Sequence, residues 1–312
     1  MIVGPPSDRQ PRATSGDRHR PCDVSSWSLV QLPPGRRGTR ITGLRTRAAC
    51  SARRGERVWP GSGAVMTDSA REATAATQAR TLVRRAATAT LATTRAGSGH
   101  PFASLVTVAT LADGSPVLHL SRLAAHTRNL DGDDRASLLF DDRDGGGDPL
   151  TRARVTVFGR IERLADDGLA RRRFLARHPA AAAWAGFSDF AFHRLIVEGG
   201  HLVAGFGRIA EIESTDLIDP LDSAHPLVAG EAEIVAALDA DRARVAAWGR
   251  QLAGDGDWHV VGVDPRGVDL VASSSDSRAF ARISLDVPAA DAAGLRTELS
   301  TWENYGKGSE FT

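Results

Sequence analysis

The chain has 312 residues, 42% hydrophobic and 25% charged, which is an ordinary globular composition that allows at least one substantial core. Its formal net charge of +1 is unevenly spread, because residues 1–65 hold twelve arginines against four acidic residues while the remainder is net acidic. A net acidic folded part gives no support to nucleic-acid binding, which needs a basic face, and both cysteines lie before residue 66, which excludes a disulfide or thiolate site beyond that point.

Residues 1–65 form a basic leader that is rich in Arg, Pro, Gly and Ser and has no sustained apolar period, so we predict that it is disordered. A helical pattern begins directly after Met66, which makes Met66 a candidate natural start; a basic targeting segment is the alternative. No run of about 18 apolar residues is present, and no secretory signal is readable. We therefore expect a cytoplasmic protein with no membrane partner.

The next part of the chain predicts a helix followed by many short strands. Residues 69–86 suit a helix with Arg80, Arg84 and Arg85 on its outer face. A short helix at 123–130 interrupts the strands. Closely spaced short strands favour a barrel or a sandwich, and two turns rich in Gly, Pro or Asp make the first three strands a meander. The predicted strands are 89–94, 102–111, 117–121, 136–141 and 154–164.

Residues 165–207 predict the closure of this sheet. Residues 165–187 are helical with a break at His178-Pro179. Residues 189–207 are predicted to form two strands around a turn at Gly199-Gly200, and this pair is expected to close the sheet.

A second, smaller unit follows the prolines at 220 and 226. We predict a helix at 231–252, strands at 258–263, 268–272 and 279–285, and a helix at 289–302. Residues 304–312 hold the only tyrosine and the only lysine of the chain and are predicted to be a tail. The predicted organisation is a leader (1–65), a barrel domain (66–215), a small α+β domain (216–303) and this tail.

The stretch from Ser121 to Leu130, SRLAAHTRNL, carries the most informative pattern. It places two hydroxyls, two guanidinium groups and an imidazole at one turn between a strand and a helix. Arginines and hydroxyls at the start of a helix suit a phosphate group. The alternative is a helix that Ser121 caps, with its arginines in solvent.

The barrel region resembles the HugZ-type heme-utilisation proteins, a branch of the pyridoxamine 5'-phosphate oxidase-like FMN-binding split-barrel superfamily. The resemblance spans about residues 79–212. The small C-terminal unit also resembles the small C-terminal domain of this family. The matching segments are 89–93, 101–110, 114–120, 121–130, 148–150, 154–161, 177–179, 186–190 and 205–208.

This resemblance implies a split β-barrel with α-helices, a homodimer and a flavin-dependent oxidoreductase that acts on a small-molecule substrate. By the family pattern, Arg122, Thr127 and Arg128 would hold the FMN phosphate, with Ser121 and His126 assisting. Ser104, in the second strand, would lie near the flavin ring or its ribityl chain; an ordinary strand hydroxyl is the alternative. Catalysis would then be carried by the cofactor.

The heme-binding branch of the family supplies an axial histidine from one of two places, and this sequence departs at both. The positions carry Ala210 and Arg242. Arginine stays protonated and cannot act as a normal axial ligand, so FMN is favoured over heme. Heme binding or degradation through another histidine, and a non-catalytic regulatory protein, remain as alternatives. The other barrel histidines are His100, His119, His126, His178, His193 and His201.

Three further patterns are weaker. Residues 205–210 fit G-x-G-x-x-A, but the residues after them look extended, so a dinucleotide-binding loop is not expected. Residues 142–153 resemble a calcium loop, but Ala153 stands where a bidentate glutamate is required, and no metal site is predicted. Asp189 is a candidate for orienting a neighbouring group, with a turn role as the alternative.

Overall fold

The computed structural model describes residues 68–308 except for 143–147, 149, 206–207 and 274–277. The basic leader and the centre of the calcium-like loop lie outside the described residues. The helices and strands follow one another along the chain in this order: α1 (Asp68–Arg85), β1 (Thr88–Thr94), β2 (Pro101–Thr110), β3 (Pro116–Ser121), α2 (Ala125–Gly132), β4 (Arg135–Asp141), β5 (Ala153–Arg163), α3 (Gly168–Arg177), η1 (Pro179–Ala183), β6 (Phe190–Ala204), β7 (Ile209–Glu213), α4 (Ser214–Leu217), α5 (Pro226–Ala229), α6 (Glu231–Asp239), α7 (Arg242–Ala253), β8 (Asp257–Asp264), β9 (Gly267–Ser273), β10 (Arg278–Ser284) and α8 (Ala292–Gly308).

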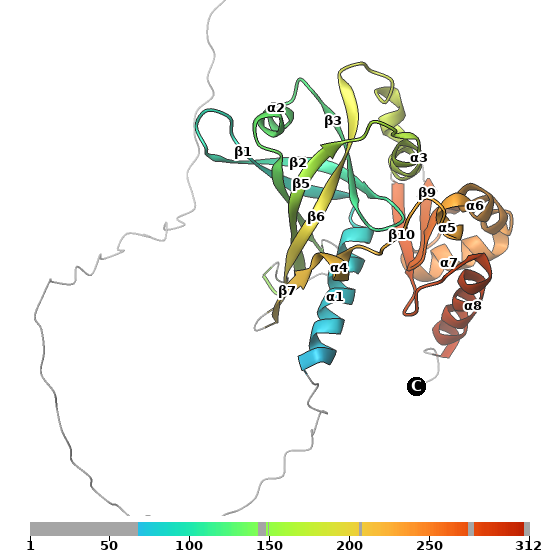
Figure 1. Ribbon diagram of the computed structural model, residues 1–312. Coiled ribbons are helices and arrows are strands. Elements are labelled where there is room, and N and C mark those ends of the chain that lie inside the picture. Colours follow the sequence, from blue (N-terminus) through green and yellow to red (C-terminus); the bar gives the residue numbers. More distant parts are fainter. Residues whose placement is uncertain (1–67, 143–147, 149, 206–207, 274–277, 309–312) are drawn as a thin grey trace, which may run out of the picture. The chain divides into compact units, whose positions relative to one another are not determined.

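The first seven strands form one antiparallel sheet in the order β3-β2-β1-β4-β5-β6-β7. Strand β3 also pairs with β6, which closes six strands into a barrel, and β7 pairs with β6 as an additional strand at the edge (Figure 1). Alternating residues of these strands, such as Leu91, Leu138 and Val157, fill the interior together with the apolar face of α1. The predicted split barrel, including its opening meander, is confirmed.

The predicted turn at Gly199-Gly200 is wrong, because β6 runs through both glycines as one long strand. Gly199 pairs with Phe158 on one side and with Glu213 on the other. A Cβ atom on Gly199 would lie 2.9 Å from Phe158 Cζ. The glycine therefore makes room for an aromatic ring lying across the sheet, and the closing partner of β3 is the same strand that carries β7.

The position of strand β7 bears on whether the glycine-rich pattern at 205–210 can be a dinucleotide-binding loop. Residues 209–213 form this strand, not a helix, so the pattern lacks the helix that a dinucleotide-binding loop requires. The expectation that the residues after this pattern are extended is confirmed by β7.

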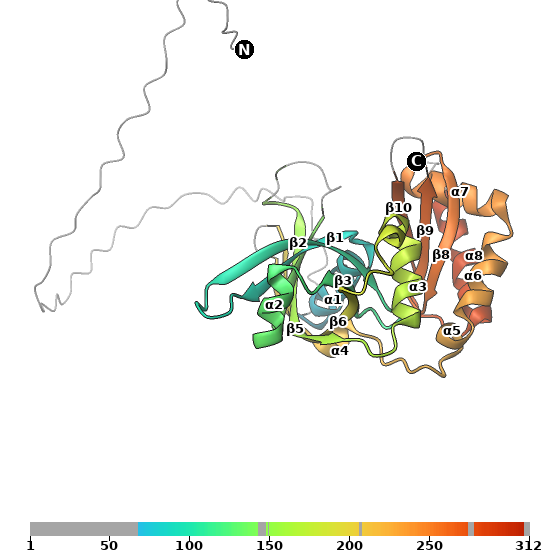
Figure 2. The ribbon, with the colours of Figure 1, turned by 90° about the horizontal axis from the view of Figure 1, so that it is seen from above.

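The small domain has a three-stranded sheet in the order β10-β9-β8, with α6, α7 and α8 on one face and α3 of the barrel domain on the other (Figure 2). The predicted helix at 231–252 is two helices, because the Asp241 side chain accepts a hydrogen bond from Arg244 N and starts α7 anew. The last helix extends through residue 308, so it includes part of the predicted tail.

A buried ion cluster joins the barrel helices to the small domain. Arg84 is only 2% exposed, which makes its predicted place on the outer face of the first helix wrong. Its guanidinium donates to Asp219 Oδ2 at 2.7 Å and approaches Asp264. Arginines and carboxylates from both parts of the chain meet here because a buried charge needs an opposite charge. The cluster consists of Arg84, Arg173, Arg177, Arg282, Asp219, Glu231, Asp264 and Asp269.

Among the described residues, no helix is both long and apolar enough to cross a membrane.

Candidate functional site

We refer to residues 121–130, the turn between β3 and α2 together with most of α2, as the β3–α2 corner. Its turn is fixed by hydrogen bonds to the segment that precedes β6. Ser121 Oγ donates to Asp189 Oδ2 at 2.6 Å and accepts from Leu123 N at 3.1 Å. Arg122 N donates to the Asp189 carbonyl at 2.7 Å. Ser121 therefore caps the turn and not the helix, since Ala124 holds the N-cap position of α2 and makes no side-chain bond there.

Helix α2 packs on the β1–β2 hairpin through polar contacts, and one of them joins two predicted site residues. His126 Nδ1 lies 3.3 Å from Ser104 Oγ. One turn later, Asn129 Nδ2 donates to Thr93 Oγ1 at 3.0 Å, and Asn129 Oδ1 accepts from Ala96 N at 3.2 Å. Burial lowers the pKa of His126, so its imidazole is neutral at pH 7.

The remaining predicted residues occupy three different environments. Arg122 is exposed, and its guanidinium makes no hydrogen bond to any described residue. Arg128 folds back so that Nη1 donates to the Leu123 carbonyl at 2.5 Å. Thr127 is buried, and its hydroxyl has no partner in the described part of the chain. The two arginines thus share the surface of the corner, whereas the threonine hydroxyl lies within the protein.

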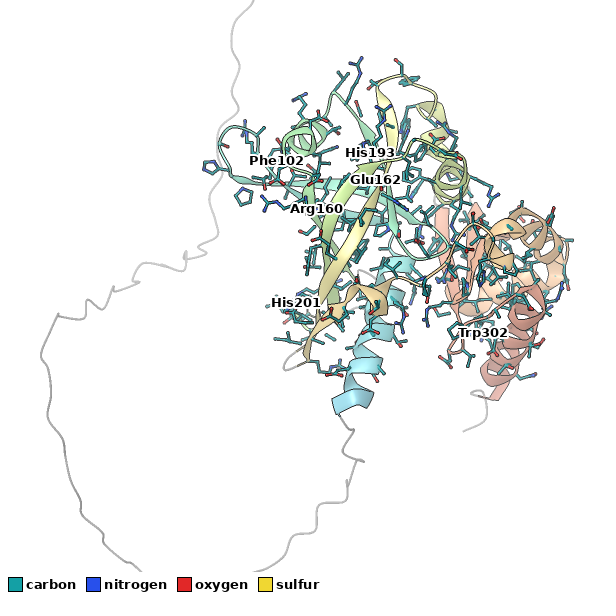
Figure 3. All side chains as sticks on the ribbon, viewed as in Figure 1. Phe102, Arg160, Glu162, His193, His201 and Trp302 are labelled. Atoms are coloured by element: carbon teal, nitrogen blue, oxygen red, sulfur yellow. The ribbon has the colours of Figure 1, made fainter. Side chains whose placement is uncertain are left out.

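His193 belongs to the same region, although the sequence pattern did not single it out. It lies on β6 (Figure 3), and its Nδ1 is 3.1 Å from the Ala191 carbonyl, which fixes the proton on Nδ1. Burial is the main reason that the pKa of His193 is lowered, and the charge of Arg163 lowers it further. A second neutral imidazole therefore stands within electrostatic range of His126.

His119, His178 and His201 contact residues of the barrel and its neighbouring helix. His119 is stacked on Phe192 at 4.3 Å between ring centroids, and neither of its ring nitrogens has a partner in the described structure. His178 Nε2 lies 2.7 Å from the Val108 carbonyl, and the more exposed His201 pairs with Glu211 at 2.6 Å. None of these three makes a contact with the corner among the interactions of the described residues.

Two large apolar side chains near the corner face solvent. Leu123 is 66% exposed and Phe187 is 58% exposed. The bond from Arg122 N to Asp189 O brings the two segments that carry them together. Exposed apolar groups of this size next to arginines suit a ligand that has both an apolar face and acidic groups.

The positions expected to carry an axial histidine in the heme-binding branch lie elsewhere. Ala210, on β7, packs against the barrel core. Arg242, at the start of α7, bonds to Asp239 at 2.7 Å and to Asp257 at 2.9 Å, and it lies beside His259. Arg242 is thus held within its own domain.

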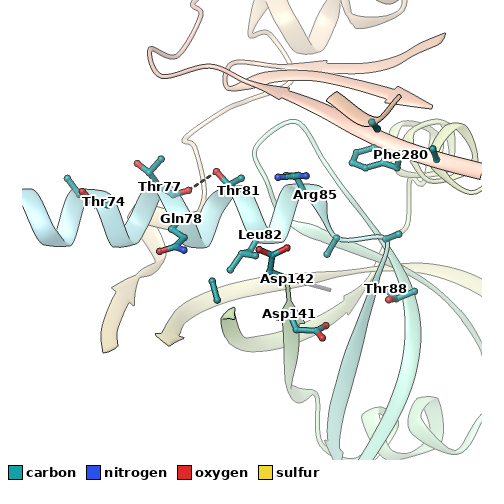
Figure 4. Close-up of a pocket in the computed structure, with 16 residues that line it drawn as sticks. Thr74, Thr77, Gln78, Thr81, Leu82, Arg85, Thr88, Asp141, Asp142 and Phe280 are labelled. Carbon is teal, nitrogen blue, oxygen red and sulfur yellow. Dashed lines mark hydrogen bonds between the residues drawn. The ribbon is translucent and has the colours of Figure 1, made fainter. Parts of the chain in front are cut away.

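A cavity of about 1160 Å³ lies away from the corner, between α1, the end of β4 and β10 (Figure 4). Its wall on α1 includes the polar side chains of Thr77, Gln78 and Thr81 and the charged Arg85, and Phe280 lines the opposite side. It borders Thr88 at the start of β1, whereas α2 contacts Thr93 near the end of that strand. No predicted site residue lines this cavity.

The lowered histidine pKa values predict that the protein loses stability on mild acidification. Burial is the first cause of the lowered pKa of His119, His126, His178 and His193. Between the folded pKa and the unfolded value of about 6.5, the unfolded chain binds more protons, so stability falls as the pH drops below that value. We expect the Tm to fall by about 5 °C or more from pH 7.5 to pH 5.5.

The matched variant for this experiment is His119→Phe, which keeps an aromatic ring among Phe174, Phe190 and Phe192. Its Tm should depend less on pH over the same range. Carboxylates whose pKa is lowered act below about pH 4 and do not contribute in this window. A Tm that stays constant from pH 7.5 to 5.5 would contradict the prediction.

Comparisons with known proteins agree with this architecture. Residues 70–219 match the family model described as CREG, beta-barrel. Over 101 residues the chain is 39% identical to the chloroplastic non-canonical heme oxygenase HOZ of Arabidopsis thaliana. This match covers 31% of this chain and 30% of that protein. The chain thus spans about a third of the length of this relative.

One solved structure shows the same arrangement over most of the chain. A protein of unknown function from Agrobacterium tumefaciens is 30% identical, with a TM-score of 0.62, and the match covers 73% of this chain and 94% of that one. A heme-binding protein from Mycobacterium smegmatis is 31% identical, with a TM-score of 0.44, over 75% of this chain and 98% of that one. The barrel region, residues 70–219, thus matches the CREG β-barrel family, and the likeness to the first of these structures extends over most of the chain.

Proposed function

We propose that the protein binds heme at the β3–α2 corner, with His126 as the axial ligand. The observation that carries this proposal is the state of His126: its pKa is lowered, and its Nδ1 lies beside Ser104 Oγ. With Nδ1 donating to that hydroxyl, the lone pair of Nε2 is available for a metal. A histidine ligand of iron is typically oriented by such a hydrogen bond at its other nitrogen.

The surroundings of His126 suit the rest of the heme group. Leu123 and Phe187 offer exposed apolar surface to the porphyrin, and Arg122 and Arg128 offer charged donors to its propionates. The similarity to a heme oxygenase supports heme over other planar ligands. Bound heme would supply oxygen activation, which makes heme degradation the reaction class that we propose.

The second candidate is an FMN-dependent oxidoreductase that uses the same corner. Arg122 favours it, because its guanidinium makes no bond to the described residues and could bind a phosphate. A spectrum of the purified protein from 300 to 600 nm separates the two candidates, since flavin and heme absorb differently. If neither FMN nor hemin raises the Tm, the non-catalytic alternative gains support.

A hemin titration tests the axial ligand. We expect a Soret shift with the wild-type protein that is lost, or weakened by about tenfold or more, in His126→Ala. His201→Ala is the control, because His201 lies in β6 with Glu211 as its partner. Loss of the shift in His193→Ala with an unchanged shift in His126→Ala would assign the ligand to His193 and reject His126.

We also propose a cytoplasmic homodimer that forms through the outer face of the barrel. Large apolar side chains lie exposed on several neighbouring strands, and a face of this kind is typical of an interface. Sedimentation should show a dimer, and Leu139→Asp should yield monomers that remain folded; a wild-type monomer at all concentrations would refute the proposal. The exposed apolar residues are Leu105, Leu139, Phe158, Ile196 and Ile209.

A further inference from the structure

We infer that Asp189 is a specificity-determining residue that weakens the binding of phosphate-bearing cofactors at the β3–α2 corner. Its carboxylate accepts the Ser121 hydroxyl at 2.6 Å, and its backbone carbonyl accepts Arg122 N at 2.7 Å. Both of these donors lie in the turn where the sequence pattern suggests a phosphate. Asp189 therefore holds the place of an anion within the corner.

The hydrogen-bond donors that a phosphate placed against Ser121 would need are already in use. Such a group binds through hydroxyls and free backbone N–H groups at the start of a helix. In this structure the Ser121 hydroxyl donates to Asp189, Leu123 N donates to Ser121 Oγ, and Ala124 N donates to the Ser121 carbonyl. A phosphate would have to break these bonds before it gained its own.

Charge acts in the same direction as the hydrogen bonds. Within the described residues, no arginine or histidine forms a salt bridge with Asp189, so its negative charge is not cancelled by a direct partner. A phosphate that contacted Ser121 Oγ would come within a few ångströms of this carboxylate, and two like charges at that distance repel strongly.

A heme propionate avoids this conflict, because it does not need to enter the turn. The guanidinium of Arg122 is exposed and the long side chain carries its charge away from the backbone. Asp189 thus discriminates between an acid group at the arginine tips and a phosphate buried against Ser121. The effect of Asp189 on phosphate binding does not depend on whether the protein binds heme.

The test compares FMN with riboflavin, which has the same ring system but no phosphate. In Asp189→Asn the amide oxygen still accepts the Ser121 hydroxyl while the charge is removed. We expect the FMN affinity, measured by flavin fluorescence quenching, to rise about tenfold or more, with riboflavin affinity unchanged. Asp255→Asn is the control, since it makes the same change of net charge at an exposed site on the small domain.

Three results would overturn the inference: FMN binding by Asp189→Asn that is no tighter than wild type, an equal gain for riboflavin, or an equal gain in Asp255→Asn. Ser121→Ala removes the hydroxyl but keeps the carboxylate, so FMN affinity should not rise in that variant. If Asp189→Asn does not fold, Asp189→Ser removes the same charge and replaces it with a smaller polar group. Hemin titration of the wild type reports on heme separately.

Discussion

Replacing Asp264 by alanine should lower the free energy of unfolding by about 3–5 kcal/mol, because the change leaves buried arginines without their carboxylate. Asp264 is fully buried. Arg282 Nη2 donates to its Oδ1 at 2.7 Å, and Arg84 and Arg173 lie within 4 Å. Urea unfolding, followed by circular dichroism, measures the change.

The pKa of Asp264 shows why its loss is costly. Burial alone would raise this pKa, but the charges of Arg282 and Arg84 lower it below its ordinary value. The carboxylate is therefore ionised at pH 7, and its stabilising contribution is lost only as the pH falls below about 4. The arginines cannot lose their protons in compensation, so removal of Asp264 leaves positive charge in the interior.

Asp255→Ala is the matched control, because Asp255 pairs with Arg250 at the surface at 2.6 Å. An exposed pair contributes at most about 1 kcal/mol. Asp264→Asn should fall between the two alanine variants, since it keeps an acceptor for Arg282 but not the charge. If Asp264→Ala and Asp255→Ala unfold at the same urea concentration, the cluster does not hold the barrel and the small domain together as we argue.

Much of the fold could be predicted from local signals in the sequence. The first five strands of the barrel are short, alternate apolar and polar residues, and end at glycine, proline or aspartate, so they could be located along the chain. Two elements were misjudged for a physical reason. A glycine pair predicts a turn because of its backbone freedom, but at 199–200 the glycine makes room for Phe158. The helix break at Asp241 depends on a side-chain cap within an otherwise continuous helical pattern.

The candidate site was less accessible to sequence analysis, because its contacts join distant segments. Ser121 and Asp189 are 68 positions apart, and only the pairing of β3 with β6 brings them together. Ser104 and His126 were assigned to one site by family resemblance, and the structure places them in contact. The burial of Arg84 was likewise not readable, since its partners Asp219 and Asp264 lie far along the chain.

Replacing Gly159 by alanine should destabilise the barrel by about 3 kcal/mol, the upper range for an overpacked core. The register between β5 and β6 shifts between Phe158 and Gly159, which marks a bulge where the two backbones approach closely. A Cβ atom on Gly159 would overlap the carbonyl group of Ile196. Because this neighbour is backbone, relief requires movement of β6, the strand that pairs with β3, β5 and β7.

Gly132→Ala provides the control for this prediction. Gly132 is the last residue of α2, and a Cβ atom there would meet nothing within 4 Å. Alanine is favoured over glycine in a helix by up to about 1 kcal/mol, so this variant should be neutral or slightly more stable than wild type. Equal urea midpoints for Gly159→Ala and wild type would mean that the strands separate at the bulge without cost. A lower midpoint together with a weakened hemin titration would instead show that the geometry of β6 reaches the corner through its pairing with β3.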